Sequence, residues 1–502
     1  MKKMKKISII LALFAGVFIS CENNDFGNLN ENVNGAQETD LQALMAGSIV
    51  RYTTLTGRDN LLKPTLYVQY QSQRVYVDEQ NYNQAPASWN GYYVQTLSNL
   101  NVITNYFENT PNPDPKILVK GSAKNQLGVA KIMKAIVWKR ITDTWGDIPY
   151  EQAFKGILVP TYSTQESIYK SEIASLIAAR NMINESELAP TGDLIYDGDL
   201  LKWKKLANSM IMSMSIQLSK KYPAPGGYAA IQFNNALNDP NGSITTVADE
   251  AWFAHTNIPG FENPYVANRR NDYGLSKTLT DALQGEALSD NPTSNHTLDN
   301  RIKIFSNKTS VTTDGIPYGL SQAASTPLNS RAKLSLNIWY AAAPTAFMTS
   351  SYTLLNRAEA AALGWTTENA LNLLEAGIVK SFESLSTKLG ASGGAATVDV
   401  TSSGPAYALA RKTDAATNLL KVIREEKWVA LFPSAFDAWS EWRRTGVPAL
   451  VPSANALNGG VIPTRYLYPS VEQSTNTASY TAGVNTLVPA VDDNKSKIWW
   501  AQ

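Results

Sequence analysis

NQLGVAKIMKAIVWKRITDTWGDIPY, residues 125–150, contains the strongest helical pattern in the chain. Over Asn125–Ile141 apolar side chains recur every three or four residues, as they do on one face of an α-helix. Gly146 and Pro149 follow, and both residue types commonly end helices. We therefore predict a helix over Asn125–Ile141 that packs one face into a core.

The same spacing predicts helices along much of the chain. They begin at Leu41 and cover Leu61–Gln71, 89–107, the segment behind a capping box of Ser163 and Glu166, Asp199–Lys220, Gly227–Leu237, Leu275–Leu283, Ser350–Leu363, Asn369–Leu389, Asp414–Leu431 and Ser434–Arg444. Short links favour antiparallel helix pairs stacked into a scaffold. No Gly/Ser linker divides the body, so we predict a mainly α fold in one large domain over 39–502.

Long stretches between these helices have the composition of loops. They are 70–89, most of 221–348, 390–413 and everything after Gly446. Stretches of this length with little regular structure usually carry function or cap a scaffold.

The only cysteine, Cys21, follows a short apolar segment. Four lysines give the chain a positive start, and Ile7–Ile19 is almost wholly apolar but shorter than the roughly 20 residues that span a bilayer. This arrangement resembles the lipobox of bacterial lipoproteins, in which a signal peptide, here 1–20, is removed and the cysteine is lipidated. The alternative is an ordinary signal peptide whose cysteine is incidental.

Residues 21–38 are rich in Asn and poor in apolar side chains, which predicts a flexible tether behind the lipidated N-terminus. Their polar and acidic start resembles the signal that directs lipoproteins of Bacteroidetes to the outer cell surface. Acyl chains on Cys21 would hold the protein on a membrane, because each buried methylene contributes about 0.8 kcal/mol.

Composition argues against several kinds of chemistry. The 44 basic residues less the 4 lysines of the signal leave 40, against 43 acidic residues, so nucleic acid is disfavoured as a partner. Two histidines and one cysteine give no basis for a histidine or cysteine metal site or a cysteine nucleophile. We expect no metal, no cofactor and no catalytic residue, and we expect His255 and His296 in solvated loops.

Two motifs identify a family. One is DTWGDIPYEQA at 143–153, and the other is REEKWVALFP at 424–433, which continues as AWSEWRRTGVP at 438–448. Together they resemble the SusD/RagB-type outer-membrane lipoproteins of Bacteroidetes, in the branch typified by WGDIPY and EWRRTG. Smaller matches extend the resemblance over nearly the whole mature chain.

The resemblance implies a mostly helical fold with tetratricopeptide-like helix pairs and a loop-rich remainder. It implies a lipid-anchored protein, exposed on the outer membrane, that acts as a lid on a SusC-type TonB-dependent transporter. Such a protein binds a nutrient, most often a glycan and in some members a peptide, and delivers it to the transporter without cutting it. A structural lipoprotein without a ligand is a further alternative.

Carboxylates in the motifs leave an enzyme as a rival interpretation. Asp143 and Asp147 are four residues apart, and paired carboxylates can cleave glycosides, so an all-helical glycoside hydrolase is conceivable. Gly146 and Pro149 interrupt the helix, however, and favour a structural corner with Trp145 packed inside.

Adjacent charges in the second motif have a structural interpretation. Glu425 and Glu426 lie beside Arg424 and Lys427, and we predict an ion-paired surface there, with Arg443-Arg444 and Glu441 in a network of the same kind.

Aromatic loops are the predicted ligand site, because a flat ring covers the apolar face of a sugar while Asn, Asp or Arg bind its hydroxyls. The first loop contributes Tyr76, Tyr82 and Trp89, with Arg74, Asp78 and Asn81 nearby. The second contributes Trp252, Asn263, Tyr265, Arg270, Asp272 and Tyr273, with Phe253 and Phe261 nearby. The alternative for each ring is that it anchors a long loop. We expect at least one or two of the set to face the ligand.

Overall fold

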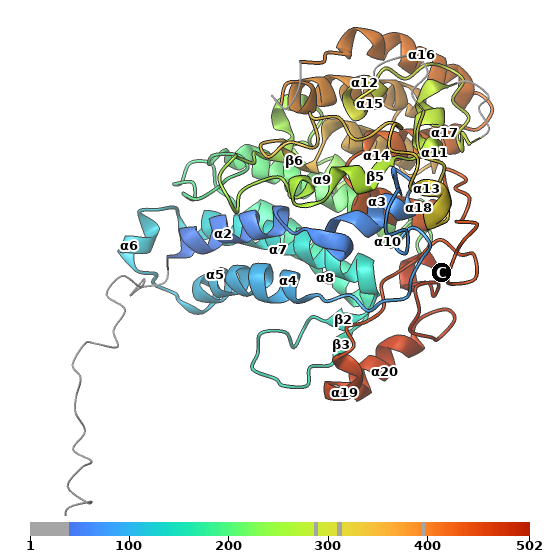
Figure 1. Ribbon diagram of the computed structural model, residues 1–502. Coiled ribbons are helices and arrows are strands. Elements are labelled where there is room, and N and C mark those ends of the chain that lie inside the picture. Colours follow the sequence, from blue (N-terminus) through green and yellow to red (C-terminus); the bar gives the residue numbers. More distant parts are fainter. Residues whose placement is uncertain (1–39, 286–289, 309–313, 393–396) are drawn as a thin grey trace, which may run out of the picture. The chain divides into compact units, whose positions relative to one another are not determined.

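The computed structural model describes residues 40–285, 290–308, 314–392 and 397–502 (Figure 1). The predicted signal peptide, Cys21 and the tether lie outside the described residues. Residues 42–502 form one compact unit, and the following description concerns that unit.

Helices dominate this unit, and the predicted mainly α fold is confirmed. The longer ones are α2 (Leu41–Thr53), α5 (Ser98–Asn109), α7 (Ala123–Trp145), α8 (Gln165–Met182), α9 (Leu200–Gln217), α10 (Tyr228–Leu237), α11 (Lys277–Gln284), α14 (Ser350–Ala362), α15 (Ala370–Leu385), α16 (Gly404–Ala415), α17 (Leu419–Ala430) and α18 (Ala435–Thr445). Short helices are α3 (Lys63–Tyr67), α4 (Asn90–Tyr92), α6 (Pro115–Leu118), α12 (Ile302–Phe305), α13 (Gln322–Ser325), α19 (Glu472–Thr475) and α20 (Thr477–Asn485). Single turns of π-helix cover η2 (Arg58–Leu62), η3 (Tyr93–Leu97) and η7 (Ser386–Gly390), and 3₁₀ turns cover η4 (Val247–Asp249), η5 (Pro264–Ala267), η6 (Arg270–Asp272), η8 (Thr401–Ser403) and η9 (Trp499–Ala501).

Consecutive helices pack as neighbours, as expected for stacked helix pairs. Helix α7 packs on α5 and α8, α8 packs on α9, and α9 packs on α10. Helix α14 contacts α9 of this series on the one hand and α15 and α17 on the other. Helix α16 in turn packs on α15 and α17. The elements with the longest apolar faces therefore form a continuous core.

Helix α7 is the longest element, and its ends follow from its sequence. The Ser122 side chain accepts a hydrogen bond from Asn125 N at the start, and Gly146, with φ +94°, follows the last turn. Most of α7 is buried, because α5, α8 and α9 all pack against it.

Three short antiparallel sheets tie the loops to this scaffold. They pair β1 (Gln71–Gln73) with β5 (Tyr273–Leu275), β2 (Ile148–Pro149) with β3 (Tyr162–Ser163), and β4 (Ala251–Phe253) with β6 (Thr345–Met348). The first pair joins the ends of the two predicted aromatic loops, since Gln73 lies opposite Tyr273.

Several predicted boundaries are wrong for local reasons. The N-cap of α8 is Thr164, which accepts from Ser167 N, whereas Ser163 belongs to β3 and accepts from Glu151 N. Residues 404–413, predicted as loop, belong to α16, because a proline near the first turn is compatible with a helix.

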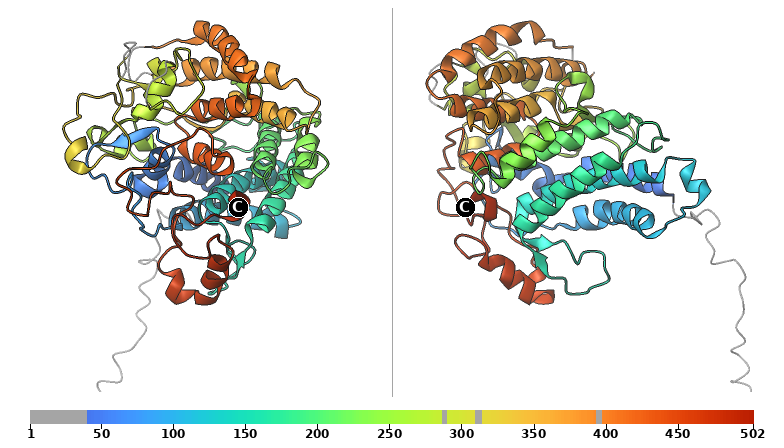
Figure 2. Two further views of the ribbon diagram at one scale, coloured as in Figure 1. Left: turned by 90° about the vertical axis from the view of Figure 1, so that its right-hand side faces the viewer. Right: turned by 180° about the vertical axis from the view of Figure 1, so that it is seen from behind.

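Two further regions also depart from the prediction. Helix α11 begins at Lys277 because Ser276 caps it and the preceding residues form β5. After Gly446, α19 and α20 interrupt the predicted loop, and α20 contacts β3 (Figure 2).

Asp143 is a structural residue at the end of α7. It is 3% exposed and accepts hydrogen bonds from Lys139 Nζ (2.8 Å), Tyr169 Oη (2.5 Å) and Trp500 Nε1 (3.0 Å). The indole of Trp145, also buried, donates to Leu467 O (3.0 Å). The motif at 143–153 therefore forms the predicted corner and binds residues from near the other end of the chain.

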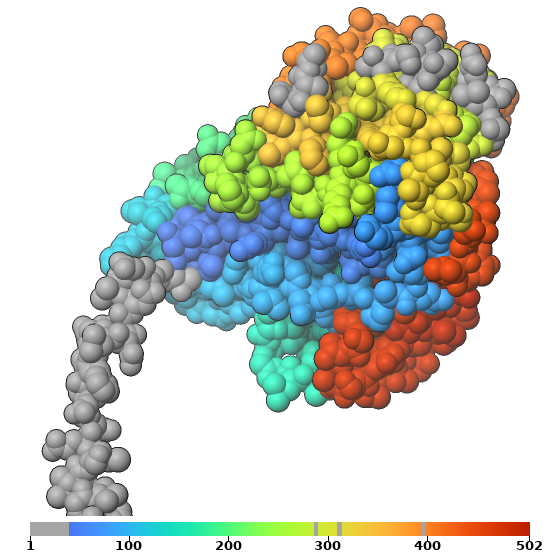
Figure 3. All heavy atoms as spheres, in the orientation of Figure 1, coloured from blue at the N-terminus to red at the C-terminus, as the bar shows by residue number. Residues whose placement is uncertain are grey.

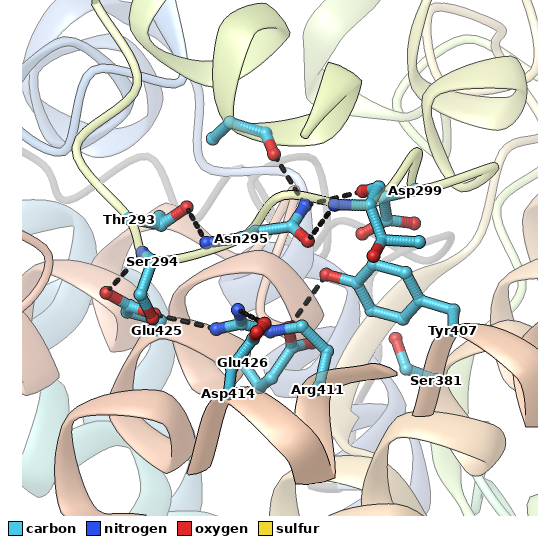
Figure 4. Close-up of polar contacts among 12 residues, drawn as sticks. Thr293, Ser294, Asn295, Asp299, Ser381, Tyr407, Arg411, Asp414, Glu425 and Glu426 are labelled. Atoms are coloured by element: carbon cyan, nitrogen blue, oxygen red, sulfur yellow. Dashed lines mark hydrogen bonds and ion pairs between the residues drawn. The ribbon is translucent and has the colours of Figure 1, made fainter. Parts of the chain in front are cut away.

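Glu425 and Glu426 lie inside the fold, so the prediction of an ion-paired surface is wrong about the surface (Figure 4). Arg411 of α16 donates to Glu425 Oε2 (2.7 Å) and Glu426 Oε1 (2.8 Å). Arg301 donates to Glu426 Oε2 at 2.8 Å. Both glutamates are buried because α16, which the sequence did not reveal, covers this side of α17.

A second buried network joins α14, α17 and α18. Glu359 accepts from Arg444 Nη1 (2.9 Å) and from Lys427, while Arg444 Nη2 donates to Glu441 Oε2 (2.5 Å). Burial opposes ionisation of Glu359, but Arg444 and Lys427 hold the pKa of its carboxyl well below the usual value. The second motif thus supplies charges that fasten helices together.

Candidate ligand-binding site

The two predicted aromatic loops meet on one face of the molecule. Arg74 N and Val75 N both donate to Asp272 O, at 2.7 and 3.3 Å, just beyond the β1–β5 pair. In Figure 3 a small blue area, which belongs to the first loop, emerges between the yellow-green and yellow segments that follow residue 250. We call the surface formed by 74–76, 269–273 and 322–340 the loop face.

Tyr76 is the most exposed aromatic residue of this face. Its residue surface is 55% exposed, and its backbone has φ +59°, in the left-handed region that side chains rarely adopt. The backbone N of Tyr76 donates to Gln322 Oε1 at 2.7 Å, which holds the residue in place. Such backbone strain, about 1–3 kcal/mol, gathers at ligand-binding sites.

Polar groups surround Tyr76. Arg74 donates through Nε to Asn271 O and through Nη1 to Thr326 O, both at 2.7 Å. Lys333 Nζ donates to the side-chain oxygens of Asn271 (2.8 Å) and Asn329 (3.0 Å). We call the cations and amides of Arg74, Asn271, Asn329 and Lys333 the polar ridge. An aromatic ring beside such a ridge suits a sugar, because the ring can cover the apolar face and the ridge can bind the hydroxyls.

A small cavity of about 20 Å³ lies beside this ridge, and we call it the Arg270 pocket. Its lining residues are Leu62, Gln71, Tyr265, Asn268, Arg270, Tyr273, Gly274, Leu334 and Trp339. The guanidinium of Arg270 donates to Leu334 O (3.1 Å from Nε) and lies 5.9 Å from the centre of the Trp339 ring. Burial raises the pKa of Tyr273 to about 12, so its phenol stays neutral.

A larger cavity of about 160 Å³, the central cavity, lies among α2, β6 and α18. Trp252, Asn263 and Tyr265 line it, and Tyr52 stacks on Phe347 at 5.6 Å. The charges that line it are paired: Lys139 bonds to Asp143, and Arg140 Nη2 lies 3.5 Å from Asp437 Oδ2. The central cavity is thus amphipathic without an uncompensated charge.

The second loop is divided between these places. Trp252 is half-buried and its Nε1 donates to Glu250 Oε2 (2.8 Å), while buried Asn263 donates to Ala343 O (2.8 Å). Tyr265 is buried and lines both cavities. Asp272 is half-buried and joins the loop face mainly through its backbone oxygen.

Tyr82 and Trp89 lie inside the fold rather than on the loop face. Tyr82 is 0% exposed, and its phenol oxygen accepts from Ser453 N at 3.1 Å. Trp89 is 7% exposed and packs edge-on against Trp145 and Tyr468. Both rings anchor the first loop, so neither belongs to the face proposed for ligand.

His255 is buried, so the prediction that it lies in a solvated loop is wrong. It is 4% exposed, with Nε2 2.8 Å from Thr345 Oγ1 and Nδ1 3.1 Å from Phe261 O. Burial lowers the pKa of its imidazole to about 4, so the ring is neutral near pH 7. His296 is exposed, as expected.

Asp143 and Asp147, the carboxylates of the hydrolase alternative, are buried and accept hydrogen bonds from other parts of the protein. Asp147 is 5% exposed and accepts from Gln165 N at 2.8 Å, and Asp143 is held as described above. In the described ranges no group of three or more acidic, His or Cys side chains is arranged to hold a metal ion. No helix there is both long enough and apolar enough to cross a bilayer.

Sequence reasoning missed Gln71, Trp339 and Lys333. Trp339 and Tyr340 follow Asn337 in a loop-rich stretch, so the aromatic-plus-amide rule that selected the other loops applies to them too. Gln71 and Lys333 carry no such signal, because only the β1–β5 pair and the fold of 322–340 bring them to Arg270.

The described residues thus form a helical scaffold with an aromatic and polar loop face, and Asp143, Asp147, Glu425 and Glu426 are buried within it. A family profile described as "starch-binding associating with outer membrane" matches residues 33–469. The chain therefore belongs to the SusD-like family, as its motifs predict, and this is a family of binding proteins rather than enzymes.

Solved structures share this fold. A chitin-binding protein is 25% identical over 92% of this chain and 100% of its own, with a TM-score of 0.76. A SusD homologue from Bacteroides fragilis is 21% identical over 93% and 100% of the two chains, with a TM-score of 0.74. A chitin-binding SusD homologue from Flavobacterium johnsoniae is 19% identical over 92% and 98%, with a TM-score of 0.71. No curated protein sequence matches the chain.

Proposed function

We propose that this protein captures an oligosaccharide or polysaccharide at the loop face and delivers it to a TonB-dependent transporter in the outer membrane. Tyr76 carries the proposal: a largely exposed ring stands on a left-handed backbone that a side-chain hydrogen bond holds. More than half of that residue is exposed, so its ring offers a flat apolar surface on which a sugar can stack.

The family and its relatives support a saccharide as the cargo. The family description names starch, and two similar structures are of chitin-binding proteins. Arg74 and Asn271 beside Tyr76 supply the hydrogen bonds that sugar hydroxyls need. A peptide is the alternative cargo, and peptide backbones would use the same amides.

Calorimetric titration of the chain without residues 1–38 tests this function. The probes are starch-type and chitin-type oligosaccharides, and we expect at least one to bind and to remain uncut. Tyr76→Ala should weaken that binding tenfold or more, which corresponds to about 1.4 kcal/mol.

Phe154→Ala is the matched control. Phe154 is 37% exposed and has φ +62°, but it contacts Trp138 and Tyr93, away from the loop face. Equal affinity of the Tyr76→Ala variant and the wild type would reject the loop face. Binding of peptides but of neither sugar series would transfer the function to peptide capture.

We also propose a lipid anchor at Cys21 and a SusC-type partner. The sequence around Cys21 and the family's association with the outer membrane support both. Purification of the full chain from membranes should retain a large barrel protein. Recovery without such a partner, together with failure of every sugar and peptide to bind, would favour a structural lipoprotein.

A further inference from the structure

The Arg270 pocket contains hydrogen-bond donors that the described chain does not satisfy. Gln71 is 2% exposed, and its amide Nε2 has no acceptor among the described residues. The indole Nε1 of Trp339 is also a buried donor without an acceptor there. Both residues line the pocket together with Arg270. Buried donors are costly when unpaired, so this pocket favours an occupant that accepts hydrogen bonds.

Arg270 lines this pocket, Arg74 and Lys333 lie near it, and none of these three cations is neutralised by a carboxylate of the described residues. Arg74, Arg270 and Lys333 donate only to carbonyl and amide oxygens. Among residues that the structure describes, no carboxylate oxygen lies within 4.0 Å of these three cations, whereas the buried Arg301 and Arg411 each bind carboxylates. Positive charge is thus left available at the loop face.

Electrostatics agree with this geometry. Burial lowers the pKa of Arg270, with no opposing carboxylate. Burial and then the charges of Arg270 and Arg74 lower the pKa of Lys333. An anion placed among these groups would relieve their mutual repulsion.

We propose that the Arg270 pocket binds a carboxylate carried by the captured saccharide, so that the cargo is an acidic glycan containing uronic acid units. This inference rests on the proposed function and specifies its substrate class. The carboxylate accepts from Arg270, Gln71 Nε2 and Trp339 Nε1, as planar guanidinium and carboxylate groups commonly pair. The pocket admits one such group but no sugar ring, so the ring remains on the loop face.

The test compares an oligogalacturonate with its fully methyl-esterified form, in which neutral and slightly larger ester groups replace the carboxylates. The salt dependence of the preference separates the effect of charge from the effect of size. We expect the wild-type chain to bind the acid at least tenfold more tightly, with a preference that falls as salt rises. Arg270→Gln should abolish the preference. Arg51→Gln, which removes the same charge from an exposed residue of α2 outside the loop face, should retain it.

Thermal unfolding of each variant separates loss of binding from loss of fold. If Arg270→Gln does not fold, Lys333→Gln provides the test, with an expected reduction of the preference by threefold or more. Equal binding of acid and ester by the wild type overturns the inference and leaves saccharide capture intact.

Two other outcomes would overturn more than the carboxylate preference. Failure of both probes and of all neutral oligosaccharides overturns the proposed function as well. Tighter binding of an acidic peptide than of the oligogalacturonate overturns the assignment of a glycan to the pocket.

Discussion

At the scale of single residues, Glu172 is a carboxyl whose ionisation opposes folding. It is 4% exposed, its Oε1 accepts from Tyr150 Oη (2.5 Å), and its Oε2 has no partner among the described residues. Burial raises its pKa to about 7, although Tyr150 and Lys134 favour the charged form.

We therefore predict that Glu172→Gln stabilises the protein at pH 8. A raised folded-state pKa contributes stability that is present below the unfolded value of about 4.5 and lost as pH rises through 7. The full shift corresponds to about 3 kcal/mol, so the variant should exceed the wild type by up to that amount at pH 8 and match it near pH 4.5. Denaturant unfolding followed by tryptophan fluorescence measures both.

The pH dependence distinguishes this cause from packing. A stability difference that is the same at pH 4.5 and pH 8 would contradict a role for ionisation. Glu185→Gln is a suitable control, because Glu185 is largely exposed and its bond to Lys204 (2.9 Å) lies at the surface.

The ligand site shows how far single residues could be predicted from sequence. Tyr76 and Tyr82 satisfied the same rule, an aromatic residue among polar neighbours in a loop. One is 55% exposed and the other 0%, because Tyr82 is covered by residues such as Tyr318 and Ser453 from distant parts of the chain. A local sequence pattern does not reveal contacts between distant segments. It therefore predicts the aromatic loops but not which of their rings is exposed.

At the scale of elements, the buried ion pairs fasten α16 to α17. We predict that Glu426→Ala destabilises the fold by about 3–5 kcal/mol, because Arg301 and Arg411 would keep their buried charges without this partner. Glu375→Ala should cost no more than about 1 kcal/mol, since its pair with Lys412 is near the surface. Chemical denaturation of both variants at pH 7 checks the difference.

Equal losses for these two variants would show that burial does not govern the strength of the pairs. A loss at Glu426 that disappears at high salt would also contradict the structure, because salt screens exposed pairs much more than buried ones.

Helix prediction succeeded or failed according to the strength of local signals. Helix α7 was recognisable because its apolar spacing is long and Gly146 marks its end. Helix α16 was missed because Gly404 and Pro405 resemble loop residues, although a proline fits a first turn. The missing helix also explains why Glu425 and Glu426 were placed at the surface.

At the scale of the whole molecule, 42–502 forms a compact unit of its own. We predict that a chain beginning at Asp40 unfolds at the same temperature as the full protein but is released from membranes. Cys21→Ala should release the full-length protein in the same way, with no acyl mass on the chain. Membrane fractionation with mass spectrometry checks both, and a membrane-bound, unacylated Cys21→Ala protein would contradict the anchor.

The position of Trp500 in the chain also limits how early the core can be completed during synthesis. Its ring binds Asp143, which precedes it by 357 residues, so the centre of the core stays incomplete until nearly the whole domain has been made. At about 5–20 residues per second, that delay lasts roughly 20–70 s. During this interval we expect the nascent polypeptide to remain loose enough to be threaded across a membrane, which a protein with an early-closing core would resist.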